Sequence, residues 1–238
     1  MSDGGRELTP PEVVRGRLAA NLESRGYILP HQGLMAAAMP RLQDGYATMY
    51  AALTIDDNYL SPFEREFVWL AVLVAAGEHV GTHHVKKFFE FGGDREHAEV
   101  VFRMVALAAG APRSFEFLEE HWEPHFVPLL GASSYRAAAD ALLHGTDVPS
   151  ELAHLALLAV HTTLAQLWGV RVELEAGYAA GVHEGKLAEA CCLPMWATGI
   201  NRTIDAAEVW LGLMRSGAVT ASESFQAWAD TDQGALRL

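Results

Sequence analysis

Apolar residues recur at helical spacing along almost the whole chain, and alternation typical of strands is hard to find. This periodicity predicts an all-α protein. A first helix is expected from Pro10-Pro11 to about Gly26, and a second over residues 33–53. The second rests on one apolar stripe at helical spacing, made by Leu34, Met35, Met39, Leu42, Tyr46, Met49 and Tyr50.

The start of the next helix carries a clear local signal. Ser61 is a good N-cap, Pro62 suits the first helical turn, and Glu64 completes a Ser-x-x-Glu capping box. The helix is expected to run to Ala76. Its second half is apolar on all sides, so we expect it to be buried.

A segment rich in histidine follows, over about residues 79–91, and Gly92-Gly93 ends it. Asp94 is expected to cap the next helix, which ends near Gly110. An aromatic and acidic stretch over residues 116–130 then connects to a further helix at residues 135–143.

The order of elements then repeats at a spacing of 89 residues. This spacing separates Ser61 from Ser150, Gly92 from Gly181, and Gly110 from Gly199. Ser150 is expected to cap a second apolar helix over residues 151–168, followed by helices at 170–180 and 184–198, the latter kinked by Pro194. His161 lies in the middle of the helix expected over residues 151–168, and we expect its side chain to be buried and to form a hydrogen bond.

Residue identity at this offset is low, so the pattern indicates a divergent duplication. We predict N-terminal helices and a first core over residues 1–110, a connection over 111–134, and a second core with a C-terminal helix over 135–238.

Charge and composition exclude several classes of partner. The formal net charge is −13, which argues against binding to nucleic acid or to anionic lipid, since both need basic surfaces. The N-terminus has no apolar signal core, and the apolar run over residues 67–76 is too short to cross a bilayer, so a soluble, cytoplasmic protein is expected. Cys191 and Cys192 point about 100° apart on a helix and are expected to be core residues.

Two stretches resemble a known superfamily. Residues 60–72 (LSPFEREFVWLAV) are similar to the first core helix of the carboxymuconolactone decarboxylase and alkylhydroperoxidase D-like superfamily, and residues 77–94 (GEHVGTHHVKKFFEFGGD) resemble its active-site helix. That helix carries two cysteines, then a histidine, then a glycine eight residues on, and His84 with Gly92 matches the last two. The resemblance covers about residues 35–110, and more weakly 150–199.

The departures from the family pattern bear on the chemistry. Gly77 and Val80 occupy the two cysteine positions, so thiol peroxidase activity is not expected. The family glutamate falls on Arg65, and a shift of one residue would restore a carboxylate from Glu64 or Glu66.

The resemblance implies a tandem of two helical cores about a pseudo-twofold axis, and self-association as a homotrimer. It also implies a lyase, decarboxylase or isomerase that needs no cofactor and acts on a small carboxylated or lactone substrate. The catalytic residues would be His84 as general acid/base with Glu64 or Glu66 as its orienter. Further substrate contacts are expected from Arg65, His83, Trp69 and, at the histidine position of the second core, Glu173.

Two other interpretations remain open at this point. His79 and His83 are four residues apart, which on a helix places them on one face, and with Glu64 or Glu66 they would make a site for a divalent metal. Alternatively, the chain binds a small molecule or assembles without catalysis, and the histidines have structural roles.

Overall fold

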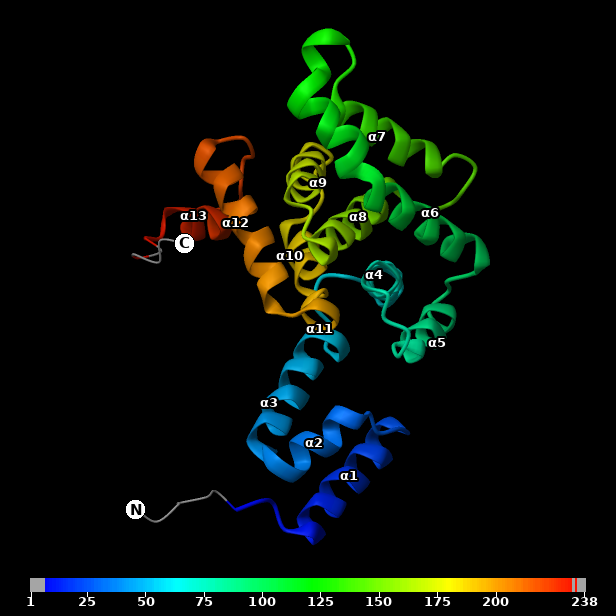
Figure 1. The fold of residues 1–238 in the computed structure, drawn as a ribbon, viewed down its shortest axis with the longest axis vertical. Coiled ribbons are helices and arrows are strands. Elements are labelled where there is room, and N and C mark those ends of the chain that lie inside the picture. Colours follow the sequence, from blue (N-terminus) through cyan, green and yellow to red (C-terminus); the bar gives the residue numbers. More distant parts are fainter. Residues whose placement is uncertain (1–6, 233, 235–238) are drawn as a thin grey trace. The chain divides into compact units, whose positions relative to one another are not determined.

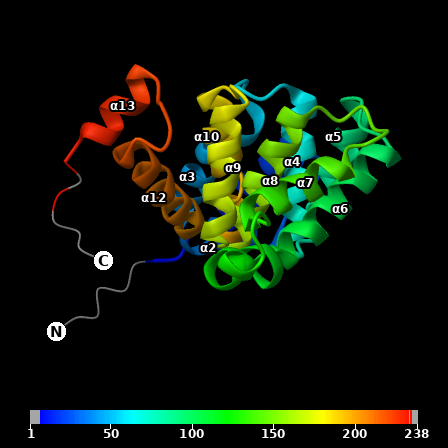
Figure 2. The ribbon, with the colours of Figure 1, turned by 90° about the horizontal axis from the view of Figure 1, so that it is seen from above.

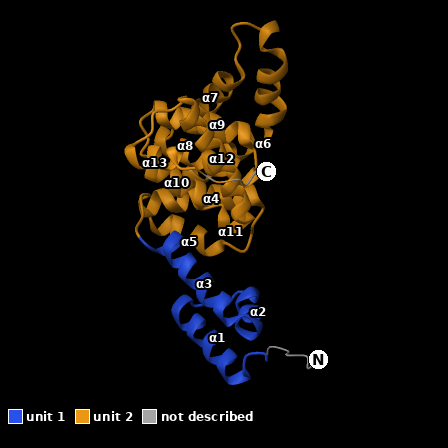
Figure 3. Cartoon of the chain, turned by 90° about the vertical axis from the view of Figure 1, so that its left-hand side faces the viewer, with its two compact units in different colours: residues 1–56 blue, residues 57–238 orange. Residues whose placement is uncertain are grey.

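The structure is a computed structural model that describes residues 7–232 and 234. These residues form helices, turns and loops with no strand, which confirms the all-α prediction (Figure 1). None of the helices in this part of the chain has the length and apolarity needed to span a lipid bilayer. The chain divides into two compact units, residues 1–56 and 57–238 (Figure 3), and the predicted boundaries at 110 and 135 both fall within the second.

The first unit is built from short helices, three of which begin with proline in the first turn. They are α1 (Pro11–Arg25), α2 (Pro30–Ala38), α3 (Pro40–Tyr50) and the π-helical segment η1 (Ala51–Ile55). The single helix expected over residues 33–53 is therefore wrong. Met39 leaves the helical conformation at φ −139° and ψ 61°, and Pro40, which has no N–H to continue the bonding of α2, starts a new helix.

The second unit contains the remaining helices. They are α4 (Pro62–Ala76), α5 (Thr82–Glu90), α6 (Arg95–Ala111), α7 (Gly131–Leu142), α8 (Ser150–Leu164), α9 (Leu167–Ala179), α10 (Glu184–Cys192), α11 (Met195–Thr198), α12 (Ile200–Ser216) and α13 (Glu223–Asp230). Between α6 and α7 lie the helical segments η2 (Pro112–Glu116), η3 (Leu118–Trp122) and η4 (Glu123–His125), so the expected connection is itself largely helical.

Helices α4 and α8 form the centre of the second unit. They pack extensively against each other, α5 and α6 pack on α4, and α9 and α10 pack on α8 (Figures 1 and 2). Every residue from 65 to 73 and from 152 to 163 is buried, as expected for helices apolar on all sides. A polar side chain on either run must therefore find its partner inside the protein.

Two of the three predicted N-cap residues, Ser61 and Asp94, are confirmed. Ser61 and Glu64 make both bonds of the capping box, and the Asp94 carboxylate accepts the His97 backbone N–H at 2.8 Å. Ser150 is not a cap, because it is already the first residue of α8 and Pro149 precedes it in extended conformation.

The helix expected over residues 184–198 is not only kinked at Pro194 but divided into two helices there. Helix α10 ends at Cys192, and α11 begins at Met195. Neither cysteine forms a disulfide, and Cys191 is buried. Burial, reinforced by the neighbouring Cys192, raises the pKa of the Cys191 thiol to about 12, which suits a core residue and not a nucleophile.

Candidate functional site

The centre of the candidate site is a buried pair, Glu66 on α4 and His84 on α5. His84 Nδ1 lies 2.7 Å from Glu66 Oε2, and the two side chains are 4 % and 0 % exposed. Gly77 ends α4 in the left-handed conformation at φ 65° and lets the chain turn back. Gly81, just before α5, allows close approach, because a Cβ there would stand 2.7 Å from the Leu73 methyl groups.

Two aromatic rings hold the His84 imidazole in place. The Trp69 ring stacks on it with centroids 4.4 Å apart and an interplanar angle of 23°. The His83 ring contacts it at 4.2 Å and 44°, and His83 is itself half-buried. The structure thus brings together four of the residues singled out in the sequence, Glu66, Trp69, His83 and His84.

The pair keeps unused hydrogen-bonding capacity. Within the described part of the chain, His84 makes the one hydrogen bond to Glu66, so its Nε2 has no partner. Glu66 Oε1 and Trp69 Nε1 are also buried without a hydrogen-bond partner among these residues. Buried polar atoms are normally paired, and such exceptions often mark places where a water molecule or a ligand binds.

Glu64, the other candidate orienter, lies elsewhere. Its carboxylate accepts the Ser61 N–H and binds Lys186 Nζ at 2.7 Å, so it caps α4 and pairs with α10. Burial raises the pKa of Glu64, but these bonds outweigh it and leave the pKa below its usual value. Arg65 is buried on α4 between the two glutamates in sequence.

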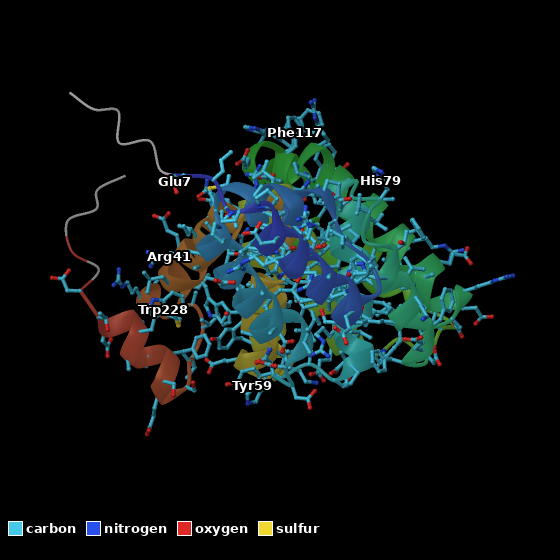
Figure 4. The ribbon with its side chains drawn as sticks, turned by 90° about the horizontal axis from the view of Figure 1, so that it is seen from below. Glu7, Arg41, Tyr59, His79, Phe117 and Trp228 are labelled. Carbon is cyan, nitrogen blue, oxygen red and sulfur yellow. The ribbon has the colours of Figure 1, made fainter. Side chains whose placement is uncertain are left out.

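His79 does not share a helix face with His83. Helix α5 begins at Thr82, so the first residues of the histidine-rich segment are not helical, and His79 lies exposed in the preceding loop (Figure 4). The spacing argument for a metal site therefore fails. Among the residues that the structure describes, no group of three or more His, Cys, Asp or Glu is arranged to hold a metal ion.

Glu173 belongs to a second buried cluster, with Arg136 from α7 and His154 from α8. Arg136 Nη1 donates to both carboxylate oxygens at 2.8 Å, and His154 Nδ1 lies 2.9 Å from Oε2. Burial raises the pKa of Glu173, but His154 and the Arg136 charge together hold it below its usual value.

The second cluster leaves His154 no free nitrogen. Arg136 Nη2 lies 3.1 Å from His154 Nε2, and a guanidinium can only donate, so Nε2 accepts and Nδ1–H donates to Glu173. Both ring nitrogens of His154 are therefore used, and the sequence interpretation did not single out either His154 or Arg136.

His161 is saturated as well. Its Nε2 lies 2.8 Å from the Tyr135 hydroxyl and its Nδ1 2.7 Å from Gln166 Oε1, which confirms a buried, hydrogen-bonded histidine. Burial lowers the pKa of His161. His97 uses both nitrogens too, on Asp94 and Asp147.

Four histidines are buried in the described part of the chain: His84, His97, His154 and His161. Of these, His84 alone keeps a ring nitrogen without a partner. A further hydrogen bond to a bound molecule is therefore open, among these four, to His84.

Comparison of this chain with protein-family models, with curated proteins and with solved structures finds no match. The similarity to the carboxymuconolactone decarboxylase superfamily stays a prediction from the residues quoted above.

Proposed function

We propose that the chain is an enzyme in which His84 transfers a proton to or from a small bound molecule. The observation that carries this is the buried Glu66–His84 bond at 2.7 Å, with Nε2 of the same imidazole unpartnered. Glu66 acts as a positioning residue. It fixes the Nδ1–H tautomer and stabilises the imidazolium that forms when Nε2 takes a proton.

The reaction class follows from the proton-transfer role proposed for His84. Histidine exchanges protons near neutral pH, which suits formation and reprotonation of a carbanion or enolate. A decarboxylation or isomerisation of a small carboxylated or lactone substrate is the reaction that the resemblance favours. Arg65, His83 and Trp69 would contact the substrate, while Glu173 is committed to Arg136 and His154.

We further propose that the second unit arose by duplication. Helices α4 and α8 each have 15 residues, and Glu66 and His154 are each the fifth. His84 and Glu173 each precede by eight residues a glycine of positive φ, Gly92 at 98° and Gly181 at 73°.

The histidine and the carboxylate have thus exchanged helices between the two pairs. The Glu66–His84 pair would be the active site, whereas Arg136 occupies the hydrogen-bonding positions of the His154–Glu173 pair. Assembly of such tandem chains into a homotrimer remains part of this proposal.

Non-catalytic binding of a small molecule at the same pair is the second candidate. The observation that favours it is the deep burial of Glu66 Oε1 and Trp69 Nε1, which suits a ligand held in place. Proton exchange distinguishes the two functions, because a binding protein need not exchange any ligand hydrogen with water.

The test measures exchange of acidic C–H hydrogens for deuterium. Carboxylated lactones and keto acids are incubated with the protein in D₂O and followed by proton NMR, which detects carbanion formation even without net turnover. The wild type is expected to accelerate exchange for at least one compound. His84→Gln should slow it by about 10²–10⁴-fold, the usual contribution of a general acid/base.

The matched control is His79→Gln, because His79 is exposed and outside α5. It should leave the exchange rate unchanged. Equal exchange by His84→Gln and wild type would refute the assignment of His84 as the base.

A further inference from the structure

The two histidine–glutamate pairs are joined through equivalent atoms, so the group bound to one pair indicates the kind of group that would bind to the other. In both, a histidine Nδ1 meets a glutamate Oε2, at 2.7 Å for His84 and Glu66 and at 2.9 Å for His154 and Glu173. In the second pair, the remaining acceptors, the histidine Nε2 and Oε1, are taken by Arg136. In the first pair, the corresponding atoms, His84 Nε2 and Glu66 Oε1, have no partner in the described chain.

The filler of the second pair is a planar cation with several N–H donors. Arg136 Nη1 donates to both Glu173 oxygens at 2.8 Å, and Nη2 lies 3.1 Å from His154 Nε2. This arrangement supplies both hydrogen bonds and charge compensation to a carboxylate that is fully buried.

Glu66 is equally buried and receives a hydrogen bond from His84 alone. A buried carboxylate with one unpaired oxygen is costly, and the cost falls when a cation binds there. Because Nε2 and Oε1 are both acceptors when His84 donates from Nδ1, these two atoms favour a cationic group, and a carboxylate on the same ligand would have to lie away from them.

We propose that the Glu66–His84 pair binds a small molecule through an amidinium or guanidinium group, the free counterpart of the Arg136 side chain. The proposal rests on the proposed function in using the same pair, and it narrows the carboxylated or lactone substrate to one that also carries such a cationic group. Glu66 Oε1 holds the cation, and His84 Nε2 faces the cation or the atom next to it. Trp69 Nε1, a donor, matches an acceptor elsewhere on the ligand.

The test uses acetamidine and methylguanidine as probes, with acetamide and acetate as the neutral and anionic counterparts. Binding to the full-length protein is measured by isothermal titration calorimetry at constant ionic strength. Acetamidine or methylguanidine is expected to bind saturably with a dissociation constant of about 1 mM, while acetamide and acetate bind far more weakly.

Glu66→Gln keeps the shape of the side chain and removes its charge, and it should weaken binding roughly 10- to 100-fold. Glu64→Gln is the matched control, since it removes a carboxylate from the same helix that contacts Ser61 and Lys186. It should bind like the wild type. Circular dichroism establishes that each variant is folded, and His84→Gln serves as a second variant should Glu66→Gln fail to fold.

Three results would overturn the proposal: no saturable binding of either cation, equal binding by wild type and Glu66→Gln, or tighter binding of acetate. Each leaves the proton-transfer proposal standing, because that one depends on the effect of His84→Gln on deuterium exchange. Conversely, cation binding could depend on Glu66 while the rate of deuterium exchange is the same in His84→Gln and in the wild type. That result would refute the proposed reaction and support the proposed class of ligand.

Discussion

Replacing Arg136 by methionine should destabilise the protein strongly at neutral pH. Methionine keeps much of the side-chain volume but removes the guanidinium that binds both oxygens of Glu173. Glu173 is fully buried and would retain His154 as its main partner. Losing one member of a buried ion pair typically costs 3–5 kcal/mol, and we expect about 3 kcal/mol because the Arg136 side chain is 16 % exposed.

The loss should shrink as the pH falls. In the wild type the pKa of Glu173 is held below its usual value, so its contribution is present above the unfolded pKa of about 4.3 and disappears as the pH drops through the folded pKa. Without Arg136, burial dominates and raises the pKa of Glu173. Acidification then favours the folded variant, because a proton on Glu173 removes the uncompensated charge.

The assay is urea denaturation followed by circular dichroism, at about pH 7.5 and about pH 5, with thermal unfolding as a second readout. A loss of about 3 kcal/mol corresponds to roughly 6–12 °C in Tm for a chain of this size. Arg103→Met is the control, since Arg103 pairs with Glu99 at the surface and should cost less than about 1 kcal/mol. A loss under about 1 kcal/mol for Arg136→Met, or an equal loss at both pH values, would refute the account of this cluster.

Two further predictions concern packing and the thiols. Gly169→Ala should destabilise the protein by more than about 2 kcal/mol, because the added Cβ would lie 2.1 Å from the buried His161 ring. Gly16→Ala is the control, since nothing lies within 4 Å of its Cβ position on α1, and it should stabilise the protein by up to about 1 kcal/mol. Equal effects of the two substitutions in urea titrations would contradict this prediction. Cys191 and Cys192, whose thiol pKa values are raised by burial, should react slowly with an aromatic disulfide reagent at mildly alkaline pH and fast in urea; rapid reaction of both in the native protein would show that they are accessible.

The misplaced helix boundaries had local causes. The apolar stripe continues from α2 into α3, so periodicity alone joined two helices that Pro40 separates. The histidine-rich segment predicted over residues 79–91 begins before α5, because Gly77 ends α4 in a left-handed conformation and the chain needs several more residues to turn. Both signals are present in the sequence, and both are stronger guides to a boundary than periodicity.

Neither spacing nor end residues predict which buried polar side chains are hydrogen-bonded to each other. Glu64 and Glu66 were equal candidates for contact with His84, and their separation along α4 points them in different directions. Arg136 and His154 gave no signal of their own, since Arg136 lies 37 residues from Glu173 on another helix.

Spacing and end residues within a few turns of one helix are enough to predict the helical class, the capping of α4 and α6 and the burial of α4, whereas His84 is singled out by the resemblance. The packing of the helices places Glu66, and not Glu64, in contact with His84, and it brings Arg136 into contact with Glu173. Those outcomes depend on how helices distant in sequence are rotated and packed against one another. On α4, two positions separate the buried contact of Glu66 with His84 from the ion pair of Glu64 with Lys186.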